Sequence, residues 1–240
     1  MEQVQHSFER YEKKYLLTPA QYEALLPRLR ERMTEDEYGM YTICNIYYDT
    51  EDYSLIRTSL SRPAYKEKFR LRSYGVPGER SLVFAEIKKK FDGVVYKRRV
   101  EGEPETIQAF VDQGKSLPAD SQIQREITCF LKRYHPEPRV FIAYERLALA
   151  GKEEDLRITF DRNIRWRDRE LDLRAGDQGS PVLADDGIVM EIKVPSAFPV
   201  WLASCLSGLE IYPTSFSKYG TCYRTCILPQ KLKKVRTQTC

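Results

Sequence analysis

The chain has 240 residues, of which 42% are hydrophobic and 31% are charged. This composition is typical of a globular protein and excludes the disordered, collagen-like and low-complexity classes. The formal net charge of +4 is too small to argue by itself for a nucleic-acid partner. The longest uncharged apolar stretch, residues 198–209, is shorter than the ~20 residues that a membrane helix needs.

The N-terminus carries no apolar signal core, so we expect a cytoplasmic protein. No linker of the Gly/Ser-rich or Pro-rich kind divides the chain. We therefore expect one domain over residues 1–230, followed by a basic, apolar-poor tail without regular structure over residues 231–240. The six cysteines contain no CxxC pair and there are only two histidines, His6 and His135. A zinc site, a disulfide framework and a histidine-based catalytic triad are therefore not expected.

Local sequence signals predict both helices and strands. Thr18 followed by Pro19 is typical of a helix start, and apolar residues then recur at helical spacing as far as Met33. Further helices are expected at residues 105–113, 123–134, 198–209 and 217–228. Strands are expected at residues 8–17, 42–49, 64–74, 81–90, 94–103, 139–148, 156–161, 164–168 and 187–195. Asp92-Gly93, between two of these strands, predicts a hairpin.

Several of the predicted strands alternate apolar residues with charged ones. A strand with a period of two places Lys66, Lys68, Arg70 and Arg72 on one face, although like charges in a row repel. The same alternation groups Glu12 with Lys14, Glu86 with Lys88, Lys97 with Arg99, Tyr144 with Arg146, Arg157 with Asp161, and Glu191 with Lys193.

A solvated outer face is the simplest explanation for one such strand, but it is a weaker explanation for five or six strands rich in Lys and Arg. We interpret the pattern as an α+β fold with a closed antiparallel β-barrel of about eight strands, whose charged face lines the lumen and whose helices pack outside. Unpaired buried charge is costly, so such a lumen needs water and a polyanion. Lys and Arg suit phosphate oxygens, and a few carboxylates suit Mg²⁺ or Mn²⁺.

These charged stretches resemble the triphosphate tunnel metalloenzymes, and among them the VTC domain of the vacuolar transporter chaperone polyphosphate polymerases. The matching stretches lie in family order at residues 8–15, 47–50, 66–75, 86–90, 96–99, 144–146, 157–161, 191–193 and 215–219. One departure separates the branches. The wider superfamily opens with Glu-x-Glu-x-Lys, whereas this chain has Arg10-Tyr-Glu12-Lys-Lys14, which resembles the VTC branch.

The resemblance implies the roles of individual residues. Phosphate contacts at the reacting groups are expected from Arg70, Arg72, Lys88, Arg146 and Arg157. Further substrate contacts are expected from Arg10, Lys14, Lys68, Lys97, Arg99, Lys193, Ser217 and Lys218. Glu191 is the expected main metal ligand, and Glu12 and Glu86 either assist it or hold the basic residues in ion pairs. We interpret Lys89, Lys90 and Arg98 as surface charges, and Asp161 as the residue that orients Arg157.

The implied activity is a metal-dependent polyphosphate polymerase that transfers the γ-phosphoryl group of ATP to a growing polyphosphate chain inside a basic tunnel, with Mn²⁺ or Mg²⁺. Two alternatives stay open: a triphosphatase on the same fold, and a non-catalytic polyanion-binding module. The expected partners are ATP and inorganic polyphosphate. No nucleic acid is expected, because the basic faces carry few of the aromatic residues that stack on bases. A separate membrane partner is compatible with the resemblance.

Overall fold

The structure is a computed structural model, and it describes residues 11–92, 94–119, 121–152, 155–195 and 197–238. The chain divides into two compact units, each described by itself below. Unit 1 comprises Met1–Tyr41, Glu145–Asn163 and Leu183–Phe216, and unit 2 comprises Thr42–Tyr144, Ile164–Val182 and Ser217–Cys240. Within the described ranges, no helix combines the length and the apolar character needed to cross a membrane.

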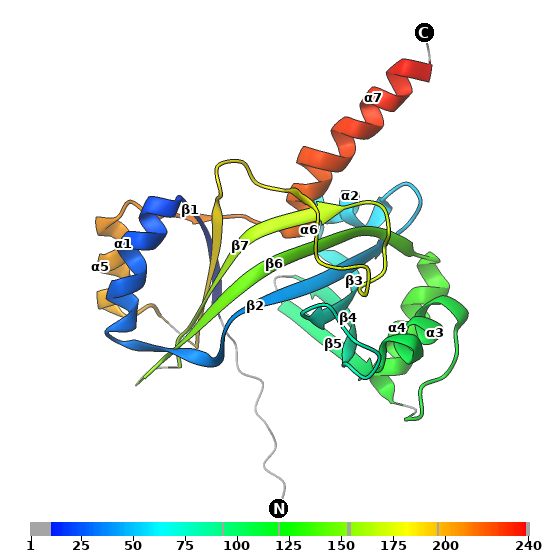
Figure 1. Ribbon diagram of the computed structural model, residues 1–240, viewed down its shortest axis with the longest axis horizontal. Helices are drawn as coiled ribbons and strands as arrows, with labels where there is room; N and C mark the ends of the chain where they lie inside the picture. Colours follow the sequence, from blue (N-terminus) through cyan, green and yellow to red (C-terminus); the bar gives the residue numbers. More distant parts are fainter. Residues whose placement is uncertain (1–10, 93, 120, 153–154, 196, 239–240) are drawn as a thin grey trace, which may run out of the picture. The chain divides into compact units, whose positions relative to one another are not determined.

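The strands and helices are spread along the whole described chain (Figure 1). The strands are β1 (Tyr11–Leu17), β2 (Met33–Asp49), β3 (Tyr65–Tyr74), β4 (Val83–Phe91), β5 (Val94–Gly102), β6 (Glu137–Gly151), β7 (Arg157–Arg167), β8 (Ser180–Pro181), β9 (Ile188–Val194) and β10 (Pro213–Thr214). The helices are α1 (Pro19–Arg30), α2 (Ser54–Leu60), α3 (Pro104–Gln113), α4 (Gln122–Tyr134), α5 (Val200–Gly208), α6 (Lys218–Cys222) and α7 (Leu228–Gln238), with a π-helical turn at Tyr223–Ile227. Strands β3 to β5 follow one another in the described chain without a helix between them, and so do strands β6 to β9.

The α+β class is confirmed, but the closed barrel of about eight strands is wrong. Hydrogen-bonded strands follow the order β10-β1-β9-β7-β6-β2-β3-β4-β5, so nine strands of the described residues form an open path, and β8 pairs with β7 beside it as the tenth strand of the sheet. The alternation of charged and apolar residues reports the two faces of a strand and carries no information on whether the first and last strands pair. The two strands predicted at residues 156–161 and 164–168 are the single strand β7.

Unit 1 has a core between strands and two helices. Leu25 and Leu29 of α1 pack in one cluster with Leu202 and Leu206 of α5. Helix α1 begins where the sequence predicts it, because Thr18 and the amide of Gln21 form a capping box. The helix ends at Arg30, earlier than predicted, and Met33 reaches the same core as the first residue of β2.

Unit 2 has its core on one face of β3 and β4. The buried residues of this face are Phe69, Leu71, Ala85 and Ile87. Helices α3 and α4 lie side by side against this part of the sheet (Figure 1), and they contribute Ile107, Phe110, Ile127 and Phe130 to the cluster. Because successive residues of a strand point to opposite faces, Lys66, Lys68, Arg70 and Arg72 of β3 lie on the face away from these two helices, with Glu86, Lys88 and Lys90 of β4. Glu67 and Lys89 lie on the helix-covered face, where Lys89 Nζ is 3.4 Å from Glu126 Oε2 of α4.

The buried carboxylate of Asp49 organises two helical segments of unit 2. Asp49 has no exposed surface, and it accepts hydrogen bonds from the amides of Leu55 at 2.9 Å and Ile56 at 3.0 Å. These bonds cap α2, a helix that local sequence signals do not predict. Asp49 also accepts a bond from the Tyr219 hydroxyl at 2.8 Å, which attaches α6 to the end of β2.

The last helix departs from the expected C-terminal tail. Residues 231–238, expected to be irregular, belong to α7. Helix α7 follows the π-helical turn directly, so the helical backbone continues from the predicted helix at residues 217–228.

We predict that Asp49→Ala lowers the free energy of unfolding by about 3 kcal/mol, because two helix amides and one buried hydroxyl lose their acceptor. Urea denaturation followed by circular dichroism measures the change. Asp52→Ala is the matched control, since the Asp52 side chain is 62% exposed in the same loop, and we expect it to cost less than about 1 kcal/mol. Equal losses in the two variants would contradict the role assigned to Asp49.

Candidate functional site

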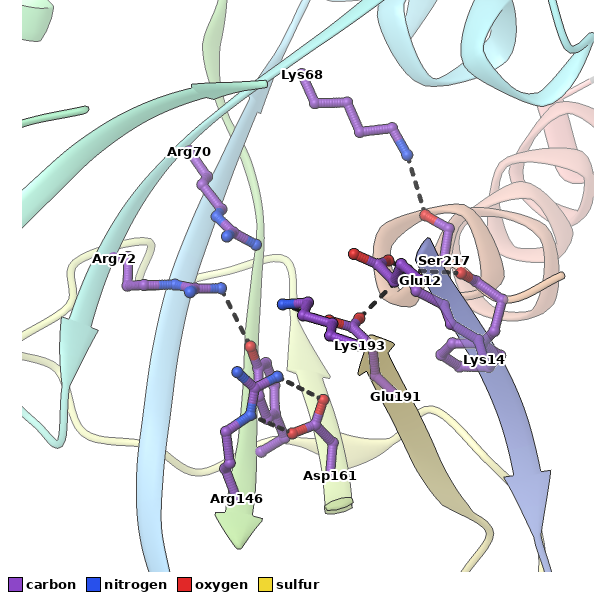
Figure 2. Close-up of polar contacts among 12 residues, drawn as sticks. Glu12, Lys14, Lys68, Arg70, Arg72, Arg146, Asp161, Glu191, Lys193 and Ser217 are labelled. Atoms are coloured by element: carbon purple, nitrogen blue, oxygen red, sulfur yellow. Dashed lines mark hydrogen bonds and ion pairs between the residues drawn. The ribbon is translucent and has the colours of Figure 1, made fainter. Parts of the chain in front are cut away.

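Unit 1 presents a checkerboard of opposite charges on β1 and β9. The register places Glu12 opposite Lys193 and Lys14 opposite Glu191, so all four side chains share one face. Lys14 Nζ lies 3.2 Å from Glu12 Oε1 and 3.6 Å from Glu191 Oε2, and Lys193 Nζ lies 2.8 Å from Glu191 Oε1. The four predicted residues are therefore brought together (Figure 2).

Strand β7 extends this face. Its Arg157 is opposite Lys193 and its Thr159 is opposite Glu191. Arg157 is exposed, and its Nη2 lies 3.8 Å from Asp36 Oδ2. The Thr159 hydroxyl is buried and makes no hydrogen bond within the described part of the chain.

Asp161 binds a different arginine from the one expected. It is buried at 1% exposure and accepts two hydrogen bonds from Arg146, from Nε at 2.6 Å and from Nη2 at 2.8 Å (Figure 2). The bidentate geometry fixes the Arg146 guanidinium plane. Asp161 thus orients Arg146 of β6, while Arg157 pairs with Asp36.

The donors of unit 1 fit a divalent cation in their chemistry. Glu12 and Glu191 supply hard carboxylate oxygens on either side of the Lys14 ammonium, and the Thr159 hydroxyl lies opposite Glu191 without a partner among the described residues. Mg²⁺ characteristically takes one or two carboxylates and completes its shell with waters and substrate phosphates. No cluster of three or more His, Cys, Asp or Glu side chains suited to a metal exists in the described ranges.

Unit 2 presents a basic face arranged around one buried carboxylate. The register places Arg70 of β3, Glu86 of β4 and Arg99 of β5 side by side. Glu86 is only 2% exposed. Its Oε2 accepts from Arg70 at 2.7 and 2.8 Å, and its Oε1 lies 2.8 Å from Lys97 Nζ. Of the two roles expected for Glu86, assisting a metal ion or holding basic residues in ion pairs, the contacts are those of ion pairs with Arg70 and Lys97.

Electrostatics keep Glu86 ionised. Burial by itself raises the pKa of a carboxyl group, but the nearby cations Arg70, Arg72 and Lys97 outweigh that effect and lower the pKa of Glu86 to about 2. The negative charge of Glu86 offsets part of the repulsion among these three cations.

Arg72 donates hydrogen bonds to neutral groups instead. Its side chain is 6% exposed. Nε donates to Asn45 Oδ1 at 3.0 Å, and Nη2 donates to the Tyr144 hydroxyl at 3.1 Å (Figure 2). Asn45 is fixed in turn by donating to the carbonyl of Ile142 at 3.0 Å. These uncharged acceptors orient the guanidinium. Its Nε also lies 3.8 Å from Glu86 Oε2, so Arg72 shares the Glu86 carboxylate with Arg70 and Lys97.

Residues 217–219 join the same unit through three different contacts. Ser217 Oγ caps α6 by accepting from the Gly220 amide, and it accepts from Lys68 Nζ at 3.0 Å (Figure 2). Lys218 Nζ lies 4.3 Å from the centre of the Tyr144 ring, a cation–π contact. Tyr219 stacks on Tyr47 with 4.8 Å between ring centres.

The two faces account for the predicted site residues as follows. Unit 1 carries Glu12, Lys14, Arg146, Arg157, Glu191 and Lys193, and unit 2 carries Lys68, Arg70, Arg72, Glu86, Lys88, Lys97, Arg99, Ser217 and Lys218. Arg10 lies outside the described residues. Sequence reasoning missed Asn45, Asp49, Tyr144 as an acceptor, and Tyr219. The contacts of Asn45, Tyr144 and Tyr219 join residues far apart in the chain. The amides that Asp49 caps follow it by six and seven residues, a spacing longer than the usual capping signal.

Two solved structures share this fold. A candidate adenylate cyclase from Bacillus halodurans superposes with a TM-score of 0.53 at 11% identity, over 86% of this chain and 92% of that one. The Hippeastrum protein HpAC1, a proposed adenylyl cyclase with a dominant triphosphatase activity, superposes with a TM-score of 0.56 at 16% identity, over 90% and 96% of the two chains. At these identities the likeness is one of fold, and the chain belongs to the class of proteins that share this fold.

Within that class, the sequence itself defines the family. The VTC domain model matches residues 9–227, so the chain belongs to the VTC domain family. No curated protein sequence matches the chain significantly.

We predict that Glu86→Gln lowers the stability of the protein at pH 7 by about 3 kcal/mol, because the shift from the ordinary pKa of 4.5 to about 2 corresponds to that free energy. The folded-state pKa is lowered, so the contribution is complete above pH 4.5 and is lost as the pH falls from about 4.5 to about 2. Urea denaturation at several pH values measures it.

The matched control is Glu101→Gln, an exposed carboxylate on β5. Between pH 4.5 and pH 2, we expect the free energy of unfolding of this variant to fall as steeply with pH as that of the wild type. The fall is expected to be shallower in Glu86→Gln. A Glu86→Gln variant with the wild-type slope would show that other groups cause the acid sensitivity.

Proposed function

We propose that this protein is a polyphosphate polymerase that transfers the γ-phosphoryl group of ATP to the end of an inorganic polyphosphate chain and releases ADP. The observation that carries the proposal is the excess of cations on the β3–β5 face, where six basic residues outnumber the two carboxylates Glu86 and Glu101. The basic residues are Lys68, Arg70, Arg72, Lys88, Lys97 and Arg99. Such a surface is costly without a polyanion. Membership of the VTC domain family supports the same substrate class.

The reaction requires positioning and charge neutralisation more than covalent chemistry. The nucleophile is a terminal phosphate oxygen of the acceptor chain, which is already anionic. It attacks the γ-phosphorus of ATP, the bond from that phosphorus to the β,γ-bridging oxygen breaks, and ADP leaves. No proton has to be removed from the nucleophile, which agrees with strand faces that contain neither His nor Cys in β1, β3, β4, β5, β7 and β9.

The basic residues have distinct tasks in this proposal. Arg70, held by Glu86 and by the Tyr47 hydroxyl at 3.1 Å, presents its guanidinium with a fixed orientation. Arg72 is oriented by neutral acceptors and shares the single Glu86 carboxylate with Arg70 and Lys97, so this group of three cations keeps a net positive charge for phosphate oxygens. Lys88, Lys97 and Arg99 reduce the repulsion between the donor and acceptor phosphates.

Glu191, with Glu12 and Thr159, would hold Mg²⁺ or Mn²⁺ in unit 1. A bound ion supplies charge neutralisation to phosphate oxygens. Lys14 and Lys193, which now pair with the same carboxylates, hold the Glu191 side chain in place and are themselves available to phosphates when an ion takes the carboxylate oxygens.

A triphosphatase is the second candidate. The fold shared with HpAC1, whose printed description includes a dominant triphosphatase activity, favours it. Water then replaces the acceptor chain. The deciding experiment incubates the purified protein with ATP and Mn²⁺ or Mg²⁺ and follows ³¹P NMR. Growth of an internal-phosphate signal with ADP supports the polymerase, orthophosphate without that signal supports the triphosphatase, and an unchanged spectrum with tight polyphosphate binding supports a binding module.

We predict that Glu191→Gln and Arg157→Ala each reduce ATP turnover by about 10²–10³-fold, the effect of removing one charged group that acts on the transition state. The controls are Glu23→Gln on α1 and Arg162→Ala on β7. Arg162 is exposed, and its side chain lies on the opposite face of the strand from that of Arg157. The circular dichroism spectra are expected to match that of the wild type. Full activity in either variant removes that residue from the proposed mechanism.

A further inference from the structure

The basic face of unit 2 continues beyond the residues assigned to the site. Three neighbouring strands form rows of directly opposed residues, and two of these rows are Arg70–Glu86–Arg99 and Lys68–Lys88–Lys97. The next row along the same face pairs Lys66 of β3 directly with Lys90 of β4. Sequence reasoning interprets Lys90 as a surface charge, and neither lysine belongs to the predicted site.

The Lys66–Lys90 row is a pair of like charges without a counterion. Like charges directly opposite one another destabilise a sheet. None of the ion pairs in the described ranges involves Lys66, Lys90 or Arg62. The neighbouring Lys89, on the opposite face, shows the contrast, since its Nζ lies 3.4 Å from Glu126 Oε2.

A third cation approaches this row. Burial lowers the pKa of Lys66, and the positive charges of Lys90 and Arg62 lower it further. Arg62 occupies the left-handed region with φ of +55°, an uncommon conformation for a residue with a side chain, in the turn between α2 and β3. Lys66 is fixed by donating from Nζ to the carbonyl of Ser59 at 3.1 Å.

Repulsion, partial burial and backbone strain thus meet at one end of the sheet. The repulsion and the partial burial of positive charge are unfavourable in the protein alone, and an anion bound between the cations reduces both. The acidic residue closest in the chain to Lys90 is Asp92, which lies in the exposed hairpin turn that follows β4.

We propose that Lys66, Lys90 and Arg62 form an additional phosphate subsite, which binds a phosphate group of an inorganic polyphosphate chain beyond the groups held by the Lys68–Lys88–Lys97 row. The subsite rests on the proposed function, because it extends the same face toward a longer substrate. Rows two residues apart are spaced by about 6.8 Å. The three rows therefore span about 14 Å, so a ligand that contacts all of them is an extended chain of several phosphates.

The subsite makes affinity depend on chain length. We predict that the double variant Lys66→Gln/Lys90→Gln binds long-chain inorganic polyphosphate about tenfold more weakly than the wild type, the effect of losing two or three partly exposed charge contacts. Its affinity for inorganic tripolyphosphate is expected to change less than twofold. Isothermal titration calorimetry without ATP or metal measures both affinities on the full chain.

A matched control and a stability measurement separate binding from folding. Lys115→Gln/Lys132→Gln removes the same charge from exposed positions outside the basic face and is expected to leave both affinities unchanged within twofold. The Lys66→Gln/Lys90→Gln variant is expected to melt at or above the wild-type temperature, because it removes a repulsion. Arg62→Gln is expected to weaken only long-chain binding, by a smaller factor.

Several results would overturn the subsite. The first is equal affinity of the wild type for the two probes. The second is a double variant with the same preference for the long chain as the wild type. The third is a double variant that binds both probes more weakly, or that melts well below the wild type. The proposed polymerase activity is tested separately by ³¹P NMR. The two proposals can therefore fail separately. If the wild type only hydrolyses ATP but the double variant binds long-chain polyphosphate more weakly, the subsite is supported and the polymerase activity is refuted.

Discussion

Repulsion among like charges on a strand face is the constraint on which the rest of this structure depends. The β3–β5 face gathers arginines and lysines at the spacing of a β-sheet, and in the absence of a ligand such a face is held together by its counterion. Glu86 fills that role through ion pairs with Arg70 and Lys97. Its burial raises the cost of an unpaired charge and makes each ion pair stronger than it is at the surface. In unit 1, Glu191 serves Lys14 and Lys193 in the same way.

Two further cations are oriented mainly by uncharged groups. Arg72 donates to an amide oxygen and a phenol hydroxyl, and Lys218 lies over the ring of the same tyrosine, Tyr144. Both contacts restrict the side chain and keep a full positive charge close to the face. Asp49 contributes indirectly, since its bond to Tyr219 holds the short helix that carries Lys218. An anion that arrives at this face therefore meets charges that are already ordered, which reduces the entropy cost of binding.

Much of the fold could be predicted wherever the signal is local. Helix α1 begins at Thr18 because the capping box needs only residues 18–21, and α3 ends at Gly114 because that residue adopts a positive φ of +67°. The charged faces of β3, β4 and β9 follow from a period of two. Helix α2 was missed because the carboxylate that caps it, Asp49, precedes the capped amides by six and seven residues and Tyr53 stands at the cap position itself.

The sequence by itself determined which residues share a strand face, and hence that Lys and Arg are concentrated there with a few carboxylates. Backbone geometry forces that alternation whatever the strand pairs with. Only the tertiary structure decided which charges meet: Asp161 with Arg146 instead of Arg157, and Glu86 with Arg70 and Lys97. It also decided that nine of the ten strands form an open path. Those outcomes depend on register and strand order, which arise from packing between residues distant in the chain and leave no periodic signal in the sequence.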